Sequence, residues 1–397
     1  MNRSSGVEVG DIFREFGPSY RASNRLPVRI LKAMRAIERC RTATLGGHID
    51  ECDACGYVRI SYNSCRNRHC PKCQSLAKEK WLTSRKKELL PVPYFHIVFT
   101  IPDSLNYLAL VNQKVLYNIL FKAASETLLK LGKDPRHLGA EIGLICILHT
   151  WGQNLMDHPH LHCIVPGGGL SKDGQKWIPS KGGGDFFIHV NVISDLFKKK
   201  FLFYLKKAYR QGRLEFVGEI EKLISQEAFG ELLNKLYKVK WHIYCKKPFG
   251  GPRQVLEYLG RYTHRVAISN NRIIKVEDGK VTFRWRDYHD DNKLKVMTLD
   301  AFEFIRRFLL HILPDNFYKI RYYGLLSSRN KKTKLKLCKE LLCPSYQEDL
   351  TRSKSWQQLL SELTDIDLRI CPCCRKGKMV TKEVLQPLIH GPPGSAV

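Results

Sequence analysis

The sequence contains no long hydrophobic run and comparatively few acidic residues. Its longest apolar stretches, around residues 95–101 and 142–148, fall well short of the roughly 18 residues that a membrane-spanning helix requires. Residues 1–10 also lack the apolar segment of a secretory signal peptide. We therefore expect a protein that does not enter a membrane and stays in the cytoplasm, where its cysteines remain mostly reduced.

The shortage of acidic residues leaves the chain strongly basic. Lys and Arg number 66 against 38 Asp and Glu, which gives a formal net charge of +28 at pH 7. A charge of this size repels itself in the folded state and is typical of proteins whose partner is a polyanion. A solvated basic surface or a membrane-surface anchor would also be basic, but here the cations run through the whole chain. We therefore predict a nucleic-acid partner and association with the nucleoid.

A phosphate-binding loop is also missing. Residues 167–169 and 182–184 are glycine triplets, but neither precedes the Lys-Ser/Thr pair that such a loop requires. Both triplets are interpreted as turns.

Composition divides the chain into three consecutive regions. Residues 1–90 combine an amphipathic helical stretch with a cysteine-rich segment and are predicted to be a small zinc-binding domain. Residues 91–326 alternate strand-like runs, as at 95–100, 143–150 and 162–166, with helices, as at 195–209, and are predicted to be the catalytic domain. Residues 327–397 begin with a basic linker and end in a cysteine-containing tail.

Four cysteines near the N-terminus form two C-x-x-C pairs, Cys52 with Cys55 and Cys70 with Cys73. Each pair can place two thiolates on one side of a tight turn, and two such pairs supply the four soft ligands that tetrahedral zinc prefers. The sequence therefore predicts one structural zinc site. Three nearby residues could replace one of the four ligands or support them, namely Cys40, Cys65 and His69. Arg66 and Arg68 stand beside the pairs and are predicted to contact phosphates.

A histidine cluster is the most informative part of the sequence. Residues 157–165 read DHPHLHCIV, and on a strand His160 and His162 share one face while Leu161 points to the other. If the preceding strand-like run forms a hairpin with this segment, Gln153 could approach the two imidazoles and add an oxygen ligand. Two imidazoles and an amide would hold Mg²⁺ or Mn²⁺ loosely, whereas a hydrolytic zinc site would add a further histidine or a carboxylate. Asp157 is available for that second arrangement, so the spacing does not settle the metal.

Tyr258 and Tyr262 lie four residues apart in a stretch that looks helical, and so they share one face of the helix. They could simply belong to an amphipathic core stripe. Arg253, Arg261 and Arg265 surround the pair, however, and a core stripe does not require such cations. Nearby positive charge and a metal-polarised phosphodiester are the conditions under which a phenol, with an ordinary pKa of about 10, becomes a useful nucleophile.

Several of these segments together resemble the insertion-sequence 91 family of transposases. The matching motifs follow one another in consistent order between about residues 10 and 330: residues 63–74 (NSCRNRHCPKCQ), 158–170 (HPHLHCIVPGGGL), 258–269 (YLGRYTHRVAIS), 303–309 (EFIRRFL) and 321–326 (RYYGLL). The first is similar to the zinc-binding domain of that family. The second resembles its HUH motif of two histidines flanking a hydrophobic residue, and the third resembles its two-tyrosine motif.

The resemblance implies an α+β fold of the HUH endonuclease kind, an antiparallel sheet with flanking helices and the histidines on a central strand. It also implies rolling-circle transposition, in which Tyr258 or Tyr262 attacks single-stranded DNA and forms a 5′-phosphotyrosine link. The metal bound by His160, His162 and Gln153 would polarise the scissile phosphate.

The tail adds an incomplete motif, because Cys371-Pro372-Cys373-Cys374 looks like half of a second zinc site. Cys338 and Cys343 are its candidate partners, at unusual spacing.

Two other functions are compatible with parts of the sequence. A non-catalytic zinc-ribbon protein that binds nucleic acid, such as a degenerate transposase, predicts loss of a histidine or tyrosine position, yet all are present. A zinc hydrolase built on Asp157, His158, His160 and His162 gives the tyrosine pair no role. A transposase with three metal-binding carboxylates would need an acidic cluster that the sequence does not show.

Overall fold

The computed structural model describes residues 6–181, 187–249, 254–255, 260, 267–287, 290–345, 367 and 369–388. The fold is α+β, as predicted, with four antiparallel sheets among these residues. Two compact units can be distinguished, and each is built from stretches that are distant in the sequence. One contains residues 1–81, 264–312 and 350–397, and the other contains residues 82–263 and 313–349. The units therefore do not coincide with the three consecutive domains, 1–90, 91–326 and 327–397, that composition suggested.

The second unit is organised around a five-stranded antiparallel sheet with strand order β12-β4-β5-β3-β8. The strands are β3 (Tyr94–Thr100), β4 (Gly143–Trp151), β5 (Asp157–Pro166), β8 (Ile243–Phe249) and β12 (Ile320–Gly324). A small hairpin is formed by β6 (Gly168–Leu170) and β7 (Trp177–Pro179). Strand β5 lies in the middle of the large sheet, between β4 and β3, so the strand that carries the histidines is supported on both sides.

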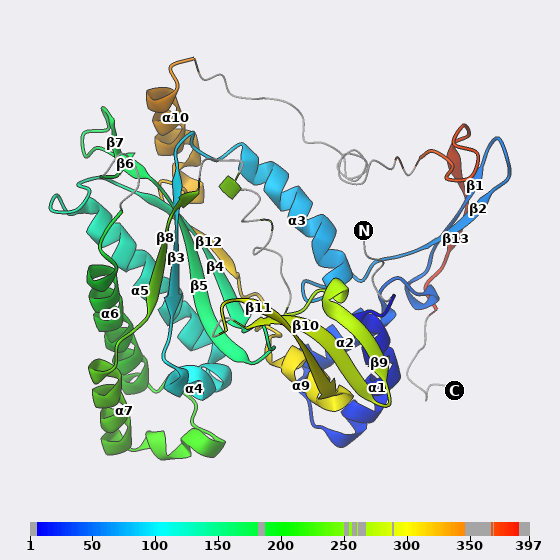
Figure 1. Cartoon of the computed structure of the whole chain (residues 1–397), viewed down its shortest axis with the longest axis horizontal. Helices are drawn as coiled ribbons and strands as arrows, with labels where there is room; N and C mark the ends of the chain where they lie inside the picture. The colour runs from blue at the N-terminus through cyan, green and yellow to red at the C-terminus, as the bar shows by residue number, and fades with distance from the viewer. Residues whose placement is uncertain are drawn as a thin grey trace, which may run out of the picture. The chain divides into compact units, whose positions relative to one another are not determined.

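Helices cover one face of this sheet (Figure 1). They are α4 (Asn106–Val111), α5 (Gln113–Lys133), α6 (Val190–Arg210) and α7 (Gln226–Lys238). Helix α10 (Lys336–Leu342) comes later in the chain. Phe197 of α6 contacts Phe99 of β3, with ring centroids 4.8 Å apart, and both side chains are fully buried. Alternation along the strands produces this face, because Leu161 and Cys163 of β5 belong to the same apolar core.

The first unit contains two further three-stranded sheets. In one, β9 (Ile273–Glu277), β10 (Lys280–Asp287) and β11 (Lys293–Asp300) form an antiparallel meander. Three helices belong with it, α1 (Val9–Ser23), α2 (Val28–Arg39) and α9 (Ala301–Leu310). Phe13 of α1 packs edge-on against Phe308 of α9 at 5.2 Å between centroids. Helices α1 and α9, almost 300 residues apart in the sequence, therefore pack against each other through apolar side chains.

The second sheet of this unit has the order β13-β1-β2 and joins the two ends of the chain. Its strands are β1 (Gly47–Cys52), β2 (Val58–Tyr62) and β13 (Met379–Leu385), and Cys52 is paired with Met379. Helix α3 (Pro71–Lys86) follows this hairpin in the sequence.

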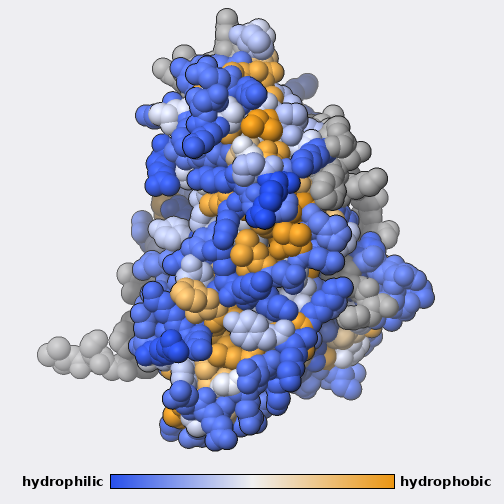
Figure 2. Space-filling view, turned by 90° about the vertical axis from the view of Figure 1, so that its left-hand side faces the viewer, coloured by the Kyte–Doolittle hydropathy of each residue, from blue (hydrophilic) through white to orange (hydrophobic). Residues whose placement is uncertain are grey.

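The strands predicted at 95–100 and 143–150 are confirmed to within a residue at each end. The strand predicted at 162–166 begins five residues earlier, at Asp157, so it includes all three histidines of the motif. The basic helix predicted at 195–209 corresponds to α6. Nowhere in the described ranges is a helix long and apolar enough to cross a membrane. Figure 2 views the side on which α6 and α7 lie and shows hydrophobic residues in separate patches among hydrophilic ones.

Candidate functional site: a three-histidine centre

The face of the large sheet opposite the apolar core carries histidines. His160 and His162 alternate with the fully buried Leu161, as the sequence predicted. Strand β4 forms a hairpin with β5, and its His149 lies directly opposite His160. Because directly paired residues of antiparallel strands point to the same face, this register adds a third imidazole to the predicted pair.

The three imidazoles converge closely enough to share one ion. One ring nitrogen from each of His149, His160 and His162 lies within 4.8 Å of the others. Their ring centroids are 4.5 Å apart for His149 and His162, 4.9 Å for His160 and His162, and 5.3 Å for His149 and His160. A divalent ion bound at about 2.0–2.1 Å from each nitrogen fits between such donors. The residues present therefore fit a metal centre with three nitrogen ligands.

Hydrogen bonds at Nδ1 orient two of these imidazoles, those of His160 and His162. Nδ1 of His160 lies 2.7 Å from the carbonyl oxygen of His158, to which it can only donate. Nδ1 of His162 lies 2.8 Å from Nε2 of His96 on β3. When Nδ1 carries the proton, the lone pair of each ring is on Nε2, which is the tautomer that a metal requires.

Burial favours the neutral form of two histidines on this face, His160 and His96. It lowers the pKa of His160 to about 4, because the charged form loses its solvation. Burial likewise lowers the pKa of His96 to about 3, and Lys246 adds to this effect. Metal binding to His160 consequently need not displace a proton at neutral pH.

Gln153, the predicted third ligand, lies half-buried in the loop that connects β4 with β5. Its part in metal binding stays a prediction. Sequence reasoning missed His149 because its approach depends on the hairpin register, and the ladder contains an irregularity between His149 and Trp151. The imidazole of His149 also stacks on the indole ring of Trp151, with ring centroids 4.6 Å apart.

The alternative hydrolase site built on Asp157 and His158 is not assembled in the described part of the chain, although His149 supplies the further histidine that a zinc site would use. Neither Asp157 nor His158 joins the cluster of histidine nitrogens. Asp157 is instead half-buried at the start of β5, where its carboxylate oxygens are shielded from solvent and lack a hydrogen-bond partner, and desolvation raises its pKa to about 7. His158 faces Asp103, with 3.8 Å between Nδ1 and Oδ1.

The predicted nucleophiles Tyr258 and Tyr262 lie outside the described residues, and so do Arg253, Arg261 and Arg265. Two neighbouring positions of this stretch can be described. Gln254 and Val255 are helical, and Val255 is fully buried. The stretch follows β8, which pairs with β3 in the sheet that carries the histidines.

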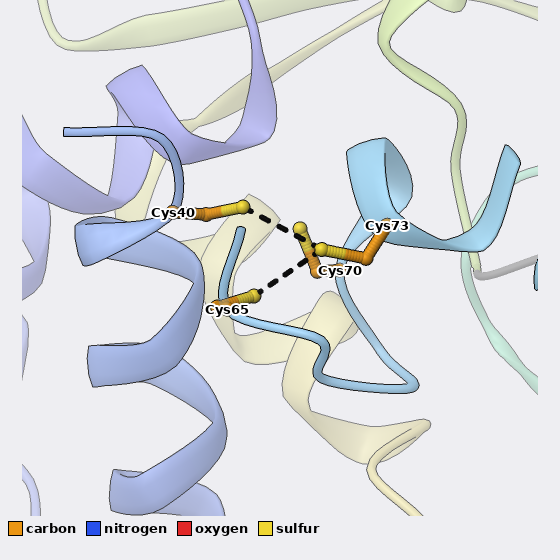
Figure 3. Close-up of side chains that lie close together, drawn as sticks. All are labelled: Cys40, Cys65, Cys70 and Cys73. Carbon is orange, nitrogen blue, oxygen red and sulfur yellow. Dashed lines mark hydrogen bonds between the residues drawn. The ribbon is translucent and has the colours of Figure 1, made fainter. Parts of the chain in front are cut away.

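The predicted four-cysteine zinc site is wrong in its grouping. Cys70 and Cys73 cluster with Cys40 and Cys65, with all sulfurs within 4.8 Å of one another. Cys40 directly follows α2, and Cys73 lies in the first turn of α3 (Figure 3). The Sγ atom of Cys73 is 3.6 Å from the sulfurs of both Cys40 and Cys65. Such separations are those of thiolates sharing a zinc ion, whose tetrahedral edge is about 3.8 Å at a Zn–S distance of 2.3 Å.

The other predicted pair, Cys52 and Cys55, belongs to a second cluster with Cys371 and Cys374. The physical reason is the pairing of β1 with β13, which brings the tail to the hairpin turn after Cys52. Cys338 and Cys343, the candidate partners of the tail, join neither cluster in the described ranges. Arg66, which is exposed, and Arg68, which is half-buried, lie in the loop between Cys65 and Cys70.

Two families match this chain. Residues 12–101 match a family described as "Transposase zinc-binding domain", and residues 143–334, which include the histidine centre, match one described as "Putative transposase". The "Putative transposase y4qJ" of Sinorhizobium fredii (strain NBRC 101917 / NGR234) is 51% identical over 392 residues, covering 98% of both chains. The transposase for insertion sequence element IS801 of Pseudomonas savastanoi pv. phaseolicola is 28% identical over 297 residues, or 73% of this chain and 68% of that one.

No solved structure matches the chain. The similarity to y4qJ nevertheless extends over almost the full length, and the two family matches contain the first cysteine cluster and the three histidines. The chain therefore belongs to the insertion-sequence 91 family of transposases, whose substrate is DNA.

Proposed function

We propose that this transposase cuts and rejoins single-stranded DNA through a covalent tyrosine intermediate, driving rolling-circle transposition. The observation that carries the proposal is the convergence of His149, His160 and His162 on one face of the central hairpin. A binding module would gain nothing from three imidazoles within reach of one ion. The tyrosine pair, the cations beside it and the membership of a transposase family complete the argument.

In the proposed reaction, the phenolate oxygen of Tyr258 or Tyr262 attacks the phosphorus of a phosphodiester. The new P–O bond links the DNA 5′ end to the tyrosine, and the bond to the 3′ oxygen breaks and leaves a free 3′-OH once that oxygen has gained a proton. Attack by a 3′-OH on the phosphotyrosine reverses these changes and joins the strands. The number of phosphodiester-type bonds is unchanged in each step, so no ATP is consumed.

The histidines serve this reaction by holding a divalent ion. When bound, the ion polarises the scissile phosphate and offsets the charge that develops on its oxygens. His96 and the carbonyl of His158 keep the ligand imidazoles in the required tautomer. The apolar core under Leu161 fixes the strand on which the ligands stand.

The metal is proposed to be Mn²⁺ or Mg²⁺, with Gln153 as a further oxygen ligand. Three nitrogen donors favour Mn²⁺ over Mg²⁺ in binding affinity, because imidazole is a softer ligand than the carboxylates and waters that Mg²⁺ prefers. We therefore expect these residues to bind Mn²⁺ more tightly than Mg²⁺, and an ion held by them would also interact with phosphate oxygens of the DNA.

The basic residues near the two motifs would bind the DNA backbone. Exposed Arg66, with Arg68, lies on the loop of the first cysteine cluster, and Arg253, Arg261 and Arg265 flank the tyrosines in the sequence. Each phosphate contact releases a counterion, so affinity should fall steeply with salt.

A decisive test uses labelled single-stranded oligonucleotides that carry candidate element ends, incubated with the full-length protein and Mn²⁺ or Mg²⁺. Denaturing gels should show a DNA–protein adduct that disappears on chelation and in the Tyr258→Phe/Tyr262→Phe double variant. Tyr237→Phe is the matched control, since Tyr237 is exposed on α7, a helix that covers the face of the sheet opposite the histidines. Cleavage that continues in the double variant without any adduct would overturn the proposal in favour of a hydrolase. DNA binding without cleavage under any condition would support the non-catalytic zinc-ribbon alternative.

A further inference from the structure

The second cysteine cluster is formed by residues from opposite ends of the chain. Sγ of Cys52 lies 3.7 Å from Sγ of Cys374, and Sγ of Cys55 lies 3.7 Å from Sγ of Cys371. All four sulfurs are within 4.8 Å of one another. Disulfide sulfurs lie about 2.05 Å apart, whereas thiolates on a tetrahedral zinc ion lie about 3.8 Å apart. The distances therefore match shared coordination.

Each half of the cluster has the same local backbone geometry. The N–H of Ala54 donates to Sγ of Cys52 at 3.4 Å, and the N–H of Cys373 donates to Sγ of Cys371 at 3.4 Å. In the first half, the N–H of Gly56 also donates to the carbonyl of Cys52 at 3.1 Å. The equivalent bond in the second half runs from Arg375 to Cys371 at 3.0 Å.

The residue after the second cysteine is left-handed in both halves, with φ of +71° at Gly56 and +56° at Arg375. Arg375 adopts this conformation although it carries a side chain, which an L-residue rarely does. Two unrelated segments thus share one turn, in which N–H groups point at sulfur and stabilise a thiolate.

The two halves are fitted closely to each other. A Cβ atom added to Gly377 would lie 2.4 Å from Sγ of Cys52 and 2.6 Å from Cβ of Ala54. The N–H of Lys378 donates to the Asp53 carboxylate at 2.7 Å, and the N–H of Asp53 donates to the Lys378 carbonyl at 3.1 Å. Gly377 therefore allows the tail to reach the first turn.

The sheet that carries the cluster buries little apolar surface of its own. On β2 and β13, Val58, Ile60, Val380 and Val384 are between 45% and 66% exposed. A small sheet without a sizeable core needs another source of stability, and a bound metal commonly supplies it.

We propose that Cys52, Cys55, Cys371 and Cys374 bind a second structural zinc ion, which closes a zinc ribbon between the two ends of the chain. The matched zinc-binding family covers residues 12–101 and contains only two of these four ligands. The C-terminal segment is thus a part of the N-terminal zinc-binding module. This inference does not depend on the tyrosine chemistry proposed above.

The first test needs no variant and uses the purified full-length protein. The exposed thiols Cys55 and Cys373 are compared by alkylation with N-ethylmaleimide, followed by peptide mass spectrometry. Cys373 should react at once. Cys55 should be protected despite its exposure and should react only after a strong chelator is added. Equal reactivity of Cys55 and Cys373 before chelation would overturn the proposal, as would a disulfide between these four cysteines in metal-free protein.

The second test measures zinc per chain by elemental analysis. Cys371→Ser/Cys374→Ser should lose one zinc equivalent relative to the unaltered protein, whereas the matched control Cys373→Ser should lose none. Cys65→Ser should lose the zinc ion of the first cysteine cluster. Combining it with the double variant should therefore remove two zinc equivalents per chain. Gly377→Ala retains all four ligands and should weaken retention of the same ion. Unchanged zinc content in the double variant would contradict the proposal.

Discussion

Nε2 of His96 lies 2.8 Å from Nδ1 of His162, and the two buried rings are nearly parallel, with 14° between their planes. His96 stands on β3 and His162 on β5, so neighbouring strands of the sheet hold the contact. If His162 binds a metal through Nε2, its Nδ1 carries the proton and donates it to His96. His96 is then a positioning residue for the centre, although it lies outside the three-histidine cluster itself.

Replacing His96 should therefore weaken metal binding without removing a ligand. For His96→Ala we expect a 10–100-fold lower affinity for Mn²⁺, the usual effect of losing such an outer partner. His96→Gln should recover part of the loss, since its amide oxygen can accept the proton of His162 Nδ1. The affinities of the two variants for Mn²⁺ are measured by calorimetric titration of Mn²⁺ into protein whose zinc sites are intact. Equal affinities for His96→Ala and the unaltered protein would show that His96 has no positioning role.

His149 provides the sharpest test of the assembled centre. His149→Ala should reduce Mn²⁺ affinity more than His96→Ala does, because it removes a nitrogen donor. His158→Ala is the matched control, since its imidazole lies outside the cluster, and its carbonyl can still accept from His160. Binding and DNA-adduct formation should be measured together. If His149→Ala and His158→Ala have the same affinity for Mn²⁺ and form the same amount of DNA adduct, His149 is not a ligand.

The sequence predicted those features that follow from local periodicity. Alternation around Leu161 placed His160 and His162 on one face, and β5 has that arrangement. The hairpin with β4, which the sequence indicated only as a condition for the approach of Gln153, is also present. These predictions succeeded because side-chain direction in a strand is set every two residues by the backbone itself.

Features that depend on long-range pairing could not be predicted in the same way. His149 meets His160 only because of the particular register of the hairpin. Cys55 and Cys371 are 316 positions apart and meet because β13 adds to β1. Neither relationship leaves a local signal, so the nearest C-x-x-C pairs in sequence were wrongly grouped. Cys40 and Cys65, which cluster with Cys70 and Cys73, do not form a C-x-x-C pair, so their spacing did not indicate this grouping.

The pH dependence of stability should reflect the buried imidazoles. The pKa of His160 is lowered to about 4 and that of His96 to about 3, whereas both would titrate near 6.5 in an unfolded chain. As the pH falls from 6.5 towards 4, the unfolded state takes up protons that the native state does not, and stability falls. The contribution is fully present above pH 6.5.

His96→Gln should flatten this dependence, because one of the two titrations is removed. Urea midpoints measured between pH 7 and pH 4.5, without Mn²⁺ or Mg²⁺, would show the change in slope. The exposed His242 offers a control, His242→Gln. Acid release of zinc from thiolates lowers the stability of all three proteins, so the slopes are compared between them. An unchanged slope in His96→Gln would contradict the assignment.

The two faces of β5 should be separable by mutation. Leu161 is fully buried in the core beneath the histidines, and Leu161→Ala should cost about 2–5 kcal/mol in the free energy of unfolding through the cavity that it leaves. It keeps every donor, so folded Leu161→Ala should bind Mn²⁺ with little change at low temperature. His162→Ala should lose Mn²⁺ binding but retain a higher free energy of unfolding than Leu161→Ala. Urea denaturation and Mn²⁺ titration on the same samples distinguish the two. If Leu161→Ala loses binding as fully as His162→Ala while still folded, the geometry of the centre depends on core packing more than on the hydrogen bonds at Nδ1.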